Sequence, residues 1–135
     1  MTATTTTTPP TLDQVLAGMT ATLNGTVPRS VQLAATVAPD LVLRHAQDSG
    51  YAMPEGAGAL TDETRTLIYL GIALATGSHA CIEAMMNKAH TLDIDQAKIL
   101  ETVKIARFAE ATRVFGNAEH VFAELAASDP GDGHR

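Results

Sequence analysis

The sequence predicts an all-α fold, and two observations support this. No segment alternates apolar and polar residues with the period of two that marks a half-buried strand. Apolar residues instead recur at spacings of three and four, and capping or helix-ending residues separate these runs. The chain has 135 residues, so one domain is expected. Hydrophobic residues make up 45% and aromatic ones only 4%, which suits thin, closely packed helices that associate into oligomers.

The first part of the chain is predicted to form three short helices. One face of the first carries Leu12, Val15, Leu16, Met19 and Leu23. Asn24-Gly25 ends this helix, and Pro28 opens the second because its missing N–H is harmless in a first turn. Pro39 breaks the pattern, and residues 40–49 are predicted to form a third helix that Gly50 closes.

Stronger helical signals follow a Gly/Pro loop at residues 51–58. Thr61 is a good N-cap residue, and residues 67–75 are apolar enough to be buried on most sides. Gly77-Ser78 ends that helix, and another is predicted from Ser78 to about Ala89.

A long helix and a short one are predicted to complete the fold. Asp93 and Gln96 resemble a capping box that opens the long helix. Its inward face is predicted to carry Ile99, Val103, Ala106 and Ala109. Gly116 weakens this helix, and residues 118–127 form the last one. The predicted organisation is a disordered tail at 1–10, a helical domain at 11–127 and a flexible tail at 128–135.

Charge and cysteine content exclude several functions. The net charge is −6, and no cluster of Lys or Arg occurs that would favour nucleic acid or an anionic membrane. One cysteine cannot form an intrachain disulfide, which fits a reducing compartment. We find no signal peptide and no apolar run approaching the roughly 18 residues of a membrane span. A soluble, cytoplasmic protein is expected.

The segment GSHACIEAM, residues 77–85, contains the single cysteine of the chain. With Ser78 as N-cap residue, Cys81 lies in the first helical turn, where the positive end of the helix dipole stabilises a thiolate. His79 would stabilise the thiolate further when protonated, or act as a base when neutral. The alternative interpretation is that Cys81 is a small, inert core residue.

Soft-metal binding is a second hypothesis for the same segment. Met85 follows Cys81 by four residues and shares its helix face. Cys81, His79 and Met85 would give a thiolate, an imidazole and a thioether, ligands that suit Cu(I). The alternative is that the methionine belongs to the helix core.

Other polar residues have two interpretations each. Tyr69 could donate a hydrogen bond into a pocket, although such a tyrosine is more often a core residue. Glu110 and Arg113 could bind a polar ligand, or they could form a salt bridge at a subunit contact, which is the interpretation we favour. His120 is a candidate pocket residue, whereas His45 is expected to be a surface or hydrogen-bonded structural histidine.

Residues 60–118 resemble the carboxymuconolactone decarboxylase and AhpD-like alkylhydroperoxidase family. The shared features are LTDE at 60–63, ATG at 75–77, Cys81-Ile82-Glu83, and the helix start between Asp93 and Gln96. The resemblance implies an all-α bundle that assembles as a homotrimer or homohexamer. It also implies a pocket near a subunit interface, lined by Tyr69, Ser78, His79, Cys81, Met85 and His120.

The active-site motif of the family is incomplete in this sequence. Peroxidase-type members carry a Glu, a C-x-x-C pair and a His four residues after the second Cys. Cys81 matches the second cysteine, but the first is Ser78, the His position is Met85 and the Glu position is Thr66. A two-thiol cycle within one chain is therefore impossible, and Thr66 and Met85 cannot relay protons.

Four functions remain open. Cys81 could serve a peroxidase-like oxidoreductase that an external thiol regenerates. The Cu(I) site is the second, and a decarboxylase-like enzyme that uses His79 on a small molecule is the third. The fourth is a non-catalytic oligomer that binds a ligand.

Overall fold

The computed structural model describes residues 7–128 and 131, and within them it contains seven helices and no strand. The helices are α1 (Leu12–Thr22), α2 (Arg29–Val37), α3 (Pro39–Ala52), α4 (Asp62–Thr76), α5 (His79–Thr91), α6 (Gln96–Asn117) and α7 (Glu119–Ser128). The all-α prediction is therefore confirmed. Among the described helices, none combines the length and the apolar character needed to cross a bilayer.

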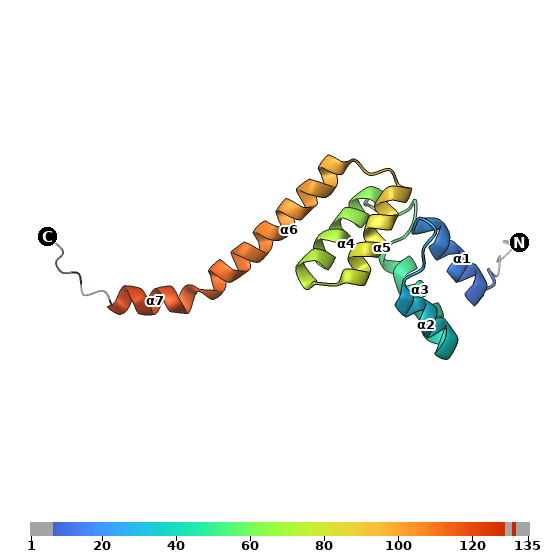
Figure 1. Ribbon diagram of the computed structural model, residues 1–135, viewed down its shortest axis with the longest axis horizontal. Coiled ribbons are helices and arrows are strands. Elements are labelled where there is room, and N and C mark those ends of the chain that lie inside the picture. The colour runs from blue at the N-terminus through green and yellow to red at the C-terminus, as the bar shows by residue number, and fades with distance from the viewer. Residues whose placement is uncertain (1–6, 129–130, 132–135) are drawn as a thin grey trace, which may run out of the picture.

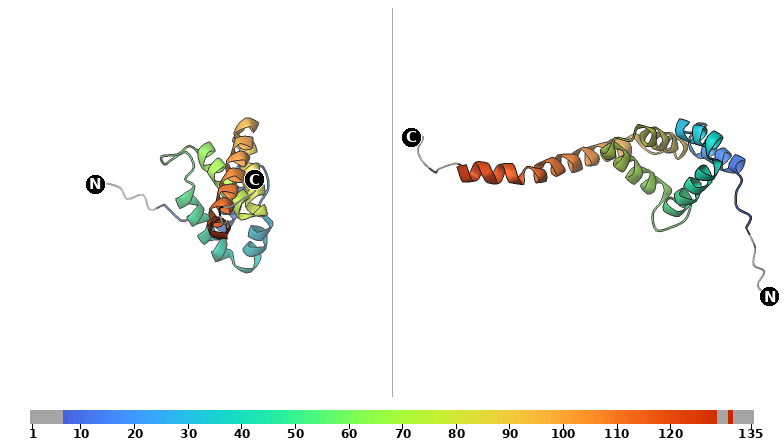
Figure 2. Two further views of the ribbon diagram at one scale, coloured as in Figure 1. Left: turned by 90° about the vertical axis from the view of Figure 1, so that its left-hand side faces the viewer. Right: turned by 90° about the horizontal axis from the view of Figure 1, so that it is seen from below.

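α4 is the helix around which the others are arranged. α5 packs along one side of α4 and α6 along another, and these are the two most extensive helix contacts. α1 and α2 pack on α3, and α1 also reaches α5. Figure 1 shows α1–α5 gathered into one group, from which α6 and α7 extend. The right-hand view in Figure 2, which is seen from below, shows α7 continuing nearly in line with α6.

The α4–α5 hairpin forms where the sequence predicts it. The hydroxyl of Thr61 accepts a hydrogen bond from the backbone N–H of Thr64 at 3.1 Å, which caps the start of α4. Gly77 ends the helix with a φ of 72°, a left-handed conformation that favours glycine. The chain then turns through Ser78 directly into α5, so the two helices lie side by side.

A buried arginine fixes the loop before α4. Arg65 is only 8% exposed, and its guanidinium donates hydrogen bonds to the backbone carbonyls of Pro54, Ala57 and Leu60. It also pairs with the carboxylate of Asp62. These loop carbonyls have no partner in a regular helix or sheet, and the Arg65 side chain supplies their hydrogen-bond donors instead. No local pattern in the sequence predicts this role of Arg65.

Two predicted helix boundaries are wrong. α3 begins at Pro39 itself and continues through Gly50 to Ala52, because proline is well suited to a first helical turn. The cap of α6 is Asp95, whose carboxylate accepts the N–H of Ala97 at 3.0 Å. Asp93 has a φ of 52° and belongs to the preceding turn, so the predicted capping box does not form.

The predicted inward faces of α4 and α6 are only partly buried. Within α4, Leu70 and Ala73 are buried, whereas Ile68 and Ile72 are 48% and 58% exposed. Of the four residues predicted to face inward from α6, Ala106 alone is buried. The prediction fails because α6 extends away from α1–α5, and no described residue covers the groove that it forms with α4.

The predicted tails overlap only partly with the described residues. Residues 7–10 are exposed and belong to no helix. Ser128, which we assigned to the C-terminal tail, is instead the last residue of α7. The rest of the predicted tails, at 1–6, 129–130 and 132–135, lies outside the described residues.

Replacing Arg65 should destabilise the fold strongly. Arg65→Met would leave the carbonyls of the 54–60 loop without their donor, so we expect the free energy of unfolding to fall by about 2–4 kcal/mol. The measurement is urea denaturation followed by circular dichroism. Arg44→Met is the matched control, because Arg44 is exposed in an i,i+4 pair with Asp48 and should change stability by less than about 0.5 kcal/mol. Equal losses in both variants would contradict this role.

Asp62 makes part of this stability sensitive to acid. The backbone N–H of Gly56 and the guanidinium of Arg65 lower the pKa of Asp62. Because its pKa is lowered on folding, ionised Asp62 stabilises the folded state above the ordinary aspartate range, and this stabilisation is lost as the pH falls through the folded-state pKa. We therefore expect the free energy of unfolding to fall less on acidification in Asp62→Asn than in the wild type. An identical pH dependence of the two proteins would show that Asp62 has no such role.

Candidate functional site

Cys81 lies in the first turn of α5. The helix begins at His79, and Ser78 is the N-cap residue in an extended conformation. The Ser78 side chain makes no capping hydrogen bond, so the N–H groups of the first turn have no side-chain acceptor. Cys81 is half-buried, which leaves its sulfur reachable from outside the helix.

A cavity of about 320 Å³ opens beside Cys81 between α5 and the N-terminal helices. Tyr69 of α4 and Met85 of α5 line it together with the cysteine. Residues of α1 and α2 contribute apolar walls, and α3 contributes His45. The cavity thus exposes the thiol to a space of small-molecule size.

The phenol of Tyr69 is the direct polar partner of Cys81. Its oxygen lies 3.3 Å from the cysteine sulfur, within hydrogen-bond distance for sulfur. When Cys81 is a thiolate, only the phenol can donate in this pair. The hydrogen bond to Cys81, together with partial burial, raises the pKa of Tyr69, so the phenol keeps its proton at neutral pH.

His79 lies on a different side of α5 from Cys81. Residues two apart on a helix are separated by about 200° around its axis. His79 accordingly lines a separate cavity, together with Glu83 and Asn87. The structure therefore does not bring His79 into the pocket of Cys81, Tyr69 and Met85.

His120 also lies away from the cysteine cavity. It stands on α7, with its side chain 84% exposed and its Nε2 atom 3.2 Å from the Glu124 carboxylate. Glu110 and Arg113 form the predicted ion pair on α6, at 2.8 Å. Both pairs belong to the part of the molecule that extends from the helical group.

The three proposed Cu(I) ligands are not assembled in one chain. Cys81 and Met85 share a cavity, whereas His79 lines another. Among the residues that the structure describes, no cluster of three or more His, Cys, Asp or Glu side chains could hold a metal ion. The geometry therefore gives no support to a three-ligand metal site.

The cavity contains titratable residues that the sequence analysis did not select. His45, expected to be a surface or hydrogen-bonded structural group, is exposed and also lines the cavity, as do Glu55 and Lys88. A spacing signal was available, because His45, Ser49 and Met53 follow one another at intervals of four and all line the cavity. Lys88 likewise continues the face of α5 that carries Cys81 and Met85.

Thr66 and Met85, at the Glu and His positions of the motif, supply no proton carrier. Thr66 is fully buried, and its hydroxyl donates to the backbone carbonyl of Asp62 at 2.8 Å. Met85 is 9% exposed and presents a thioether to the cavity. Tyr69, three residues after Thr66 and so on the next turn of α4, makes the contact with sulfur.

A family model for the carboxymuconolactone decarboxylase family matches residues 39–124. This range runs from the start of α3 into α7 and includes His45, Tyr69 and Cys81. The chain belongs to the carboxymuconolactone decarboxylase family. The predicted resemblance is confirmed, and it extends further toward both ends than residues 60–118. A comparison with curated proteins found no match.

The Tyr69–Cys81 contact predicts that the pKa of Tyr69 changes when the cysteine is removed. The chain has two tyrosines, so Tyr51→Phe leaves Tyr69 as the sole phenol. Adding Cys81→Ala removes the hydrogen bond and should move the Tyr69 pKa down toward the ordinary tyrosine value. The measurement is a pH titration of phenolate absorbance in the ultraviolet. An unchanged midpoint after the cysteine is removed would exclude the contact in solution.

Proposed function

We propose that this protein is a single-cysteine thiol oxidoreductase that reduces a small hydroperoxide through Cys81. The observation that supports this most is the hydrogen bond of Tyr69 to a sulfur that lies in an open cavity. A phenol that stays protonated donates to the thiolate, which is the nucleophilic form of cysteine. The site therefore combines a nucleophile, a hydrogen-bond donor and space for a substrate.

The first step oxidises the cysteine. The thiolate sulfur attacks one oxygen of the hydroperoxide, the S–O bond forms and the O–O bond breaks. The other oxygen leaves with the bonding electron pair and takes up a proton, giving an alcohol or water. Cys81 becomes a sulfenic acid. We assign the proton delivery to His45, because it is the histidine that lines the cysteine cavity.

The second step needs an external thiol, because the chain has no other cysteine. One external thiol condenses with the sulfenic acid, which gives a mixed disulfide and releases water. A second external thiol attacks the mixed disulfide, restores Cys81 and leaves as the external disulfide. A reducing cytoplasm would supply such a thiol.

A decarboxylase that uses His79 would have no role for the thiol, because His79 lies in another cavity from Tyr69 and Cys81. It predicts that Cys81→Ser keeps full activity, whereas the thiol mechanism predicts that this variant is inactive. A non-catalytic ligand-binding role predicts a thiol that peroxide does not oxidise, so one experiment separates the two.

Peroxide treatment in the presence of a sulfenic-acid trap should label Cys81. We expect the adduct by mass spectrometry in the wild type and its absence in Cys81→Ser. Tyr69→Phe should react several-fold more slowly, because the sulfur loses the phenol that donates a hydrogen bond to its thiolate form. Tyr51→Phe is the control and should react at the wild-type rate. Lack of trapping in the wild type would refute the proposed chemistry.

A pair of histidine variants tests the proton donor. His45→Ala should slow sulfenic-acid formation, because it removes the histidine that lines the cysteine cavity. His79→Ala should leave the rate unchanged, because its side chain lies in the other cavity. Stopped-flow measurement of peroxide consumption in a single turnover gives both rates. The reverse pattern, with His79→Ala slow and His45→Ala normal, would reassign the donor.

A further inference from the structure

A single copy of the chain exposes far more surface than a folded monomer of its size. Its accessible surface is 10344 Å² at a mass of 14.1 kDa. A compact monomer of that mass exposes about 6,700 Å², so the excess is about 3,600 Å². A stable interface removes about 800 Å² from each partner. The excess would accommodate such an interface even if the chain ends outside the described residues accounted for half of it.

Much of the exposed apolar surface lies on α7 and the end of α6. The large apolar side chains there are between 48% and 72% exposed: Val114, Phe115, Val121, Phe122 and Leu125. The rings of Phe115 and Phe122 have centroids 5.5 Å apart, so the two helices share an apolar side. Within the described part of the chain, α7 packs appreciably only on α6, and Figure 1 shows it standing clear of α1–α5.

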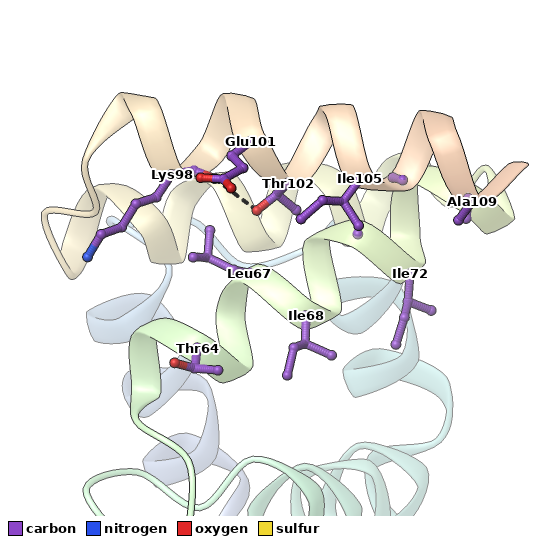
Figure 3. A pocket seen from close by; sticks show the side chains of 12 residues that line it. Thr64, Leu67, Ile68, Ile72, Lys98, Glu101, Thr102, Ile105 and Ala109 are labelled. Carbon is purple, nitrogen blue, oxygen red and sulfur yellow. Dashed lines mark hydrogen bonds between the residues drawn. The ribbon is translucent and has the colours of Figure 1, made fainter. Parts of the chain in front are cut away.

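A second uncovered surface is the groove between α4 and α6. It has a volume of about 530 Å³ and is lined on the α4 side by Leu67, Ile68 and Ile72. Ile105 and Ala109 line it from α6, as Figure 3 shows. Small residues at positions 71, 75, 106 and 109 keep the groove open along its length.

The α7 of the same chain is unable to fill this groove. α7 follows α6 after a single residue, and its ten residues span about 15 Å. If it folded back along α6, it would lie beside roughly the last ten residues of that helix, at about 107–117. The groove follows residues 98–109 of α6, so only its far end could be reached.

The length of α7 nevertheless matches the groove. The α4 residues that line it, 64–75, extend over about 17 Å, close to the length of α7. The charged side chains that line the groove are Lys98 and Glu101, so it has no net negative charge that would repel the two glutamates of α7.

We propose that α7 of one copy of this chain binds in the α4–α6 groove of another copy. The exchange would cover Val121, Phe122 and Leu125 of the first copy together with Ile68 and Ile72 of the second. It gives a structural form to the homo-oligomer expected from the sequence. It does not depend on the chemistry proposed for Cys81.

Disulfide cross-linking between two differently tagged chains tests this arrangement. Both chains carry Cys81→Ser. One also carries Phe122→Cys on α7, and the other carries Ile68→Cys, Ile72→Cys or Ile105→Cys in the groove, which allows for different registers. The chains are mixed, allowed to exchange subunits in mild denaturant, returned to buffer and oxidised. We expect a covalent product that contains both tags for at least one groove position.

Tyr51→Cys is the matched control for the α7 cysteine, because Tyr51 is exposed on α3 and far from α7 in sequence. When a Tyr51→Cys chain is mixed with a groove-cysteine chain, the covalent product that contains both tags should be at least tenfold less abundant than with Phe122→Cys. Phe122→Cys chains that link to one another and never to the groove would overturn the proposal in favour of α7–α7 pairing. A wild-type chain that sediments as a 14.1 kDa monomer at micromolar concentration would also overturn it.

Point variants give an independent readout of the same contact. Leu125→Glu and Ile72→Glu each place a carboxylate in the proposed interface, so each should weaken self-association at least tenfold in sedimentation equilibrium. Val37→Glu changes an exposed valine on α2 and should leave self-association unchanged. Wild-type association of both interface variants would overturn the proposal.

Discussion

The guanidinium of Arg65 holds the start of α4 against the loop that precedes it, and the geometry of the site depends on this contact. Because three loop carbonyls and Asp62 converge on one buried side chain, the first turns of α4 have a fixed position. Tyr69 lies one turn after Arg65 on the same helix. The left-handed Gly77 then returns the chain so that Cys81 lies beside Tyr69. A structural interaction in the loop thus positions a functional one in the cavity.

This protein retains the fold of the carboxymuconolactone decarboxylase family and has a different set of polar groups around the cysteine. A buried threonine and a methionine occupy two positions where the resemblance implies a carboxylate and an imidazole. The polar group that contacts the sulfur is a phenol on α4, and a histidine on α3 lines the same cavity. The proposed chemistry is accordingly that of one thiol with an external reductant.

Local signals in the sequence predicted the central hairpin well. Thr61 and Gly77 act within a few residues of their own positions, so their effects can be inferred without tertiary structure. Asp93 could not be distinguished from Asp95 as a cap, because both precede α6 and the choice depends on the path of the intervening turn. Ile68 and Ile72 were predicted to be buried, since periodicity reports an apolar face and not the molecule that covers it.

The candidate site was only partly predictable for the same reason. The placement of Cys81 in a first turn follows from the chain reversal at Gly77-Ser78, which is local. The position of His45 in the cavity lining depends on how α3 lies against the cavity, and a single histidine on a polar helix gives no such information. His79 seemed close to Cys81 in sequence, yet two residues along a helix lead to opposite sides.

The measurement that tests the central claim most directly is the alkylation rate of Cys81 at neutral pH. The wild type is compared with Tyr69→Phe and with an unstructured peptide of residues 77–85, which has the same neighbours and no Tyr69. If the Tyr69 phenol stabilises the thiolate, the folded protein reacts faster than the peptide and Tyr69→Phe loses most of the difference. A wild-type rate below that of the peptide and equal to that of Tyr69→Phe would mean that Cys81 is an inert structural thiol, and the account of the site would be wrong.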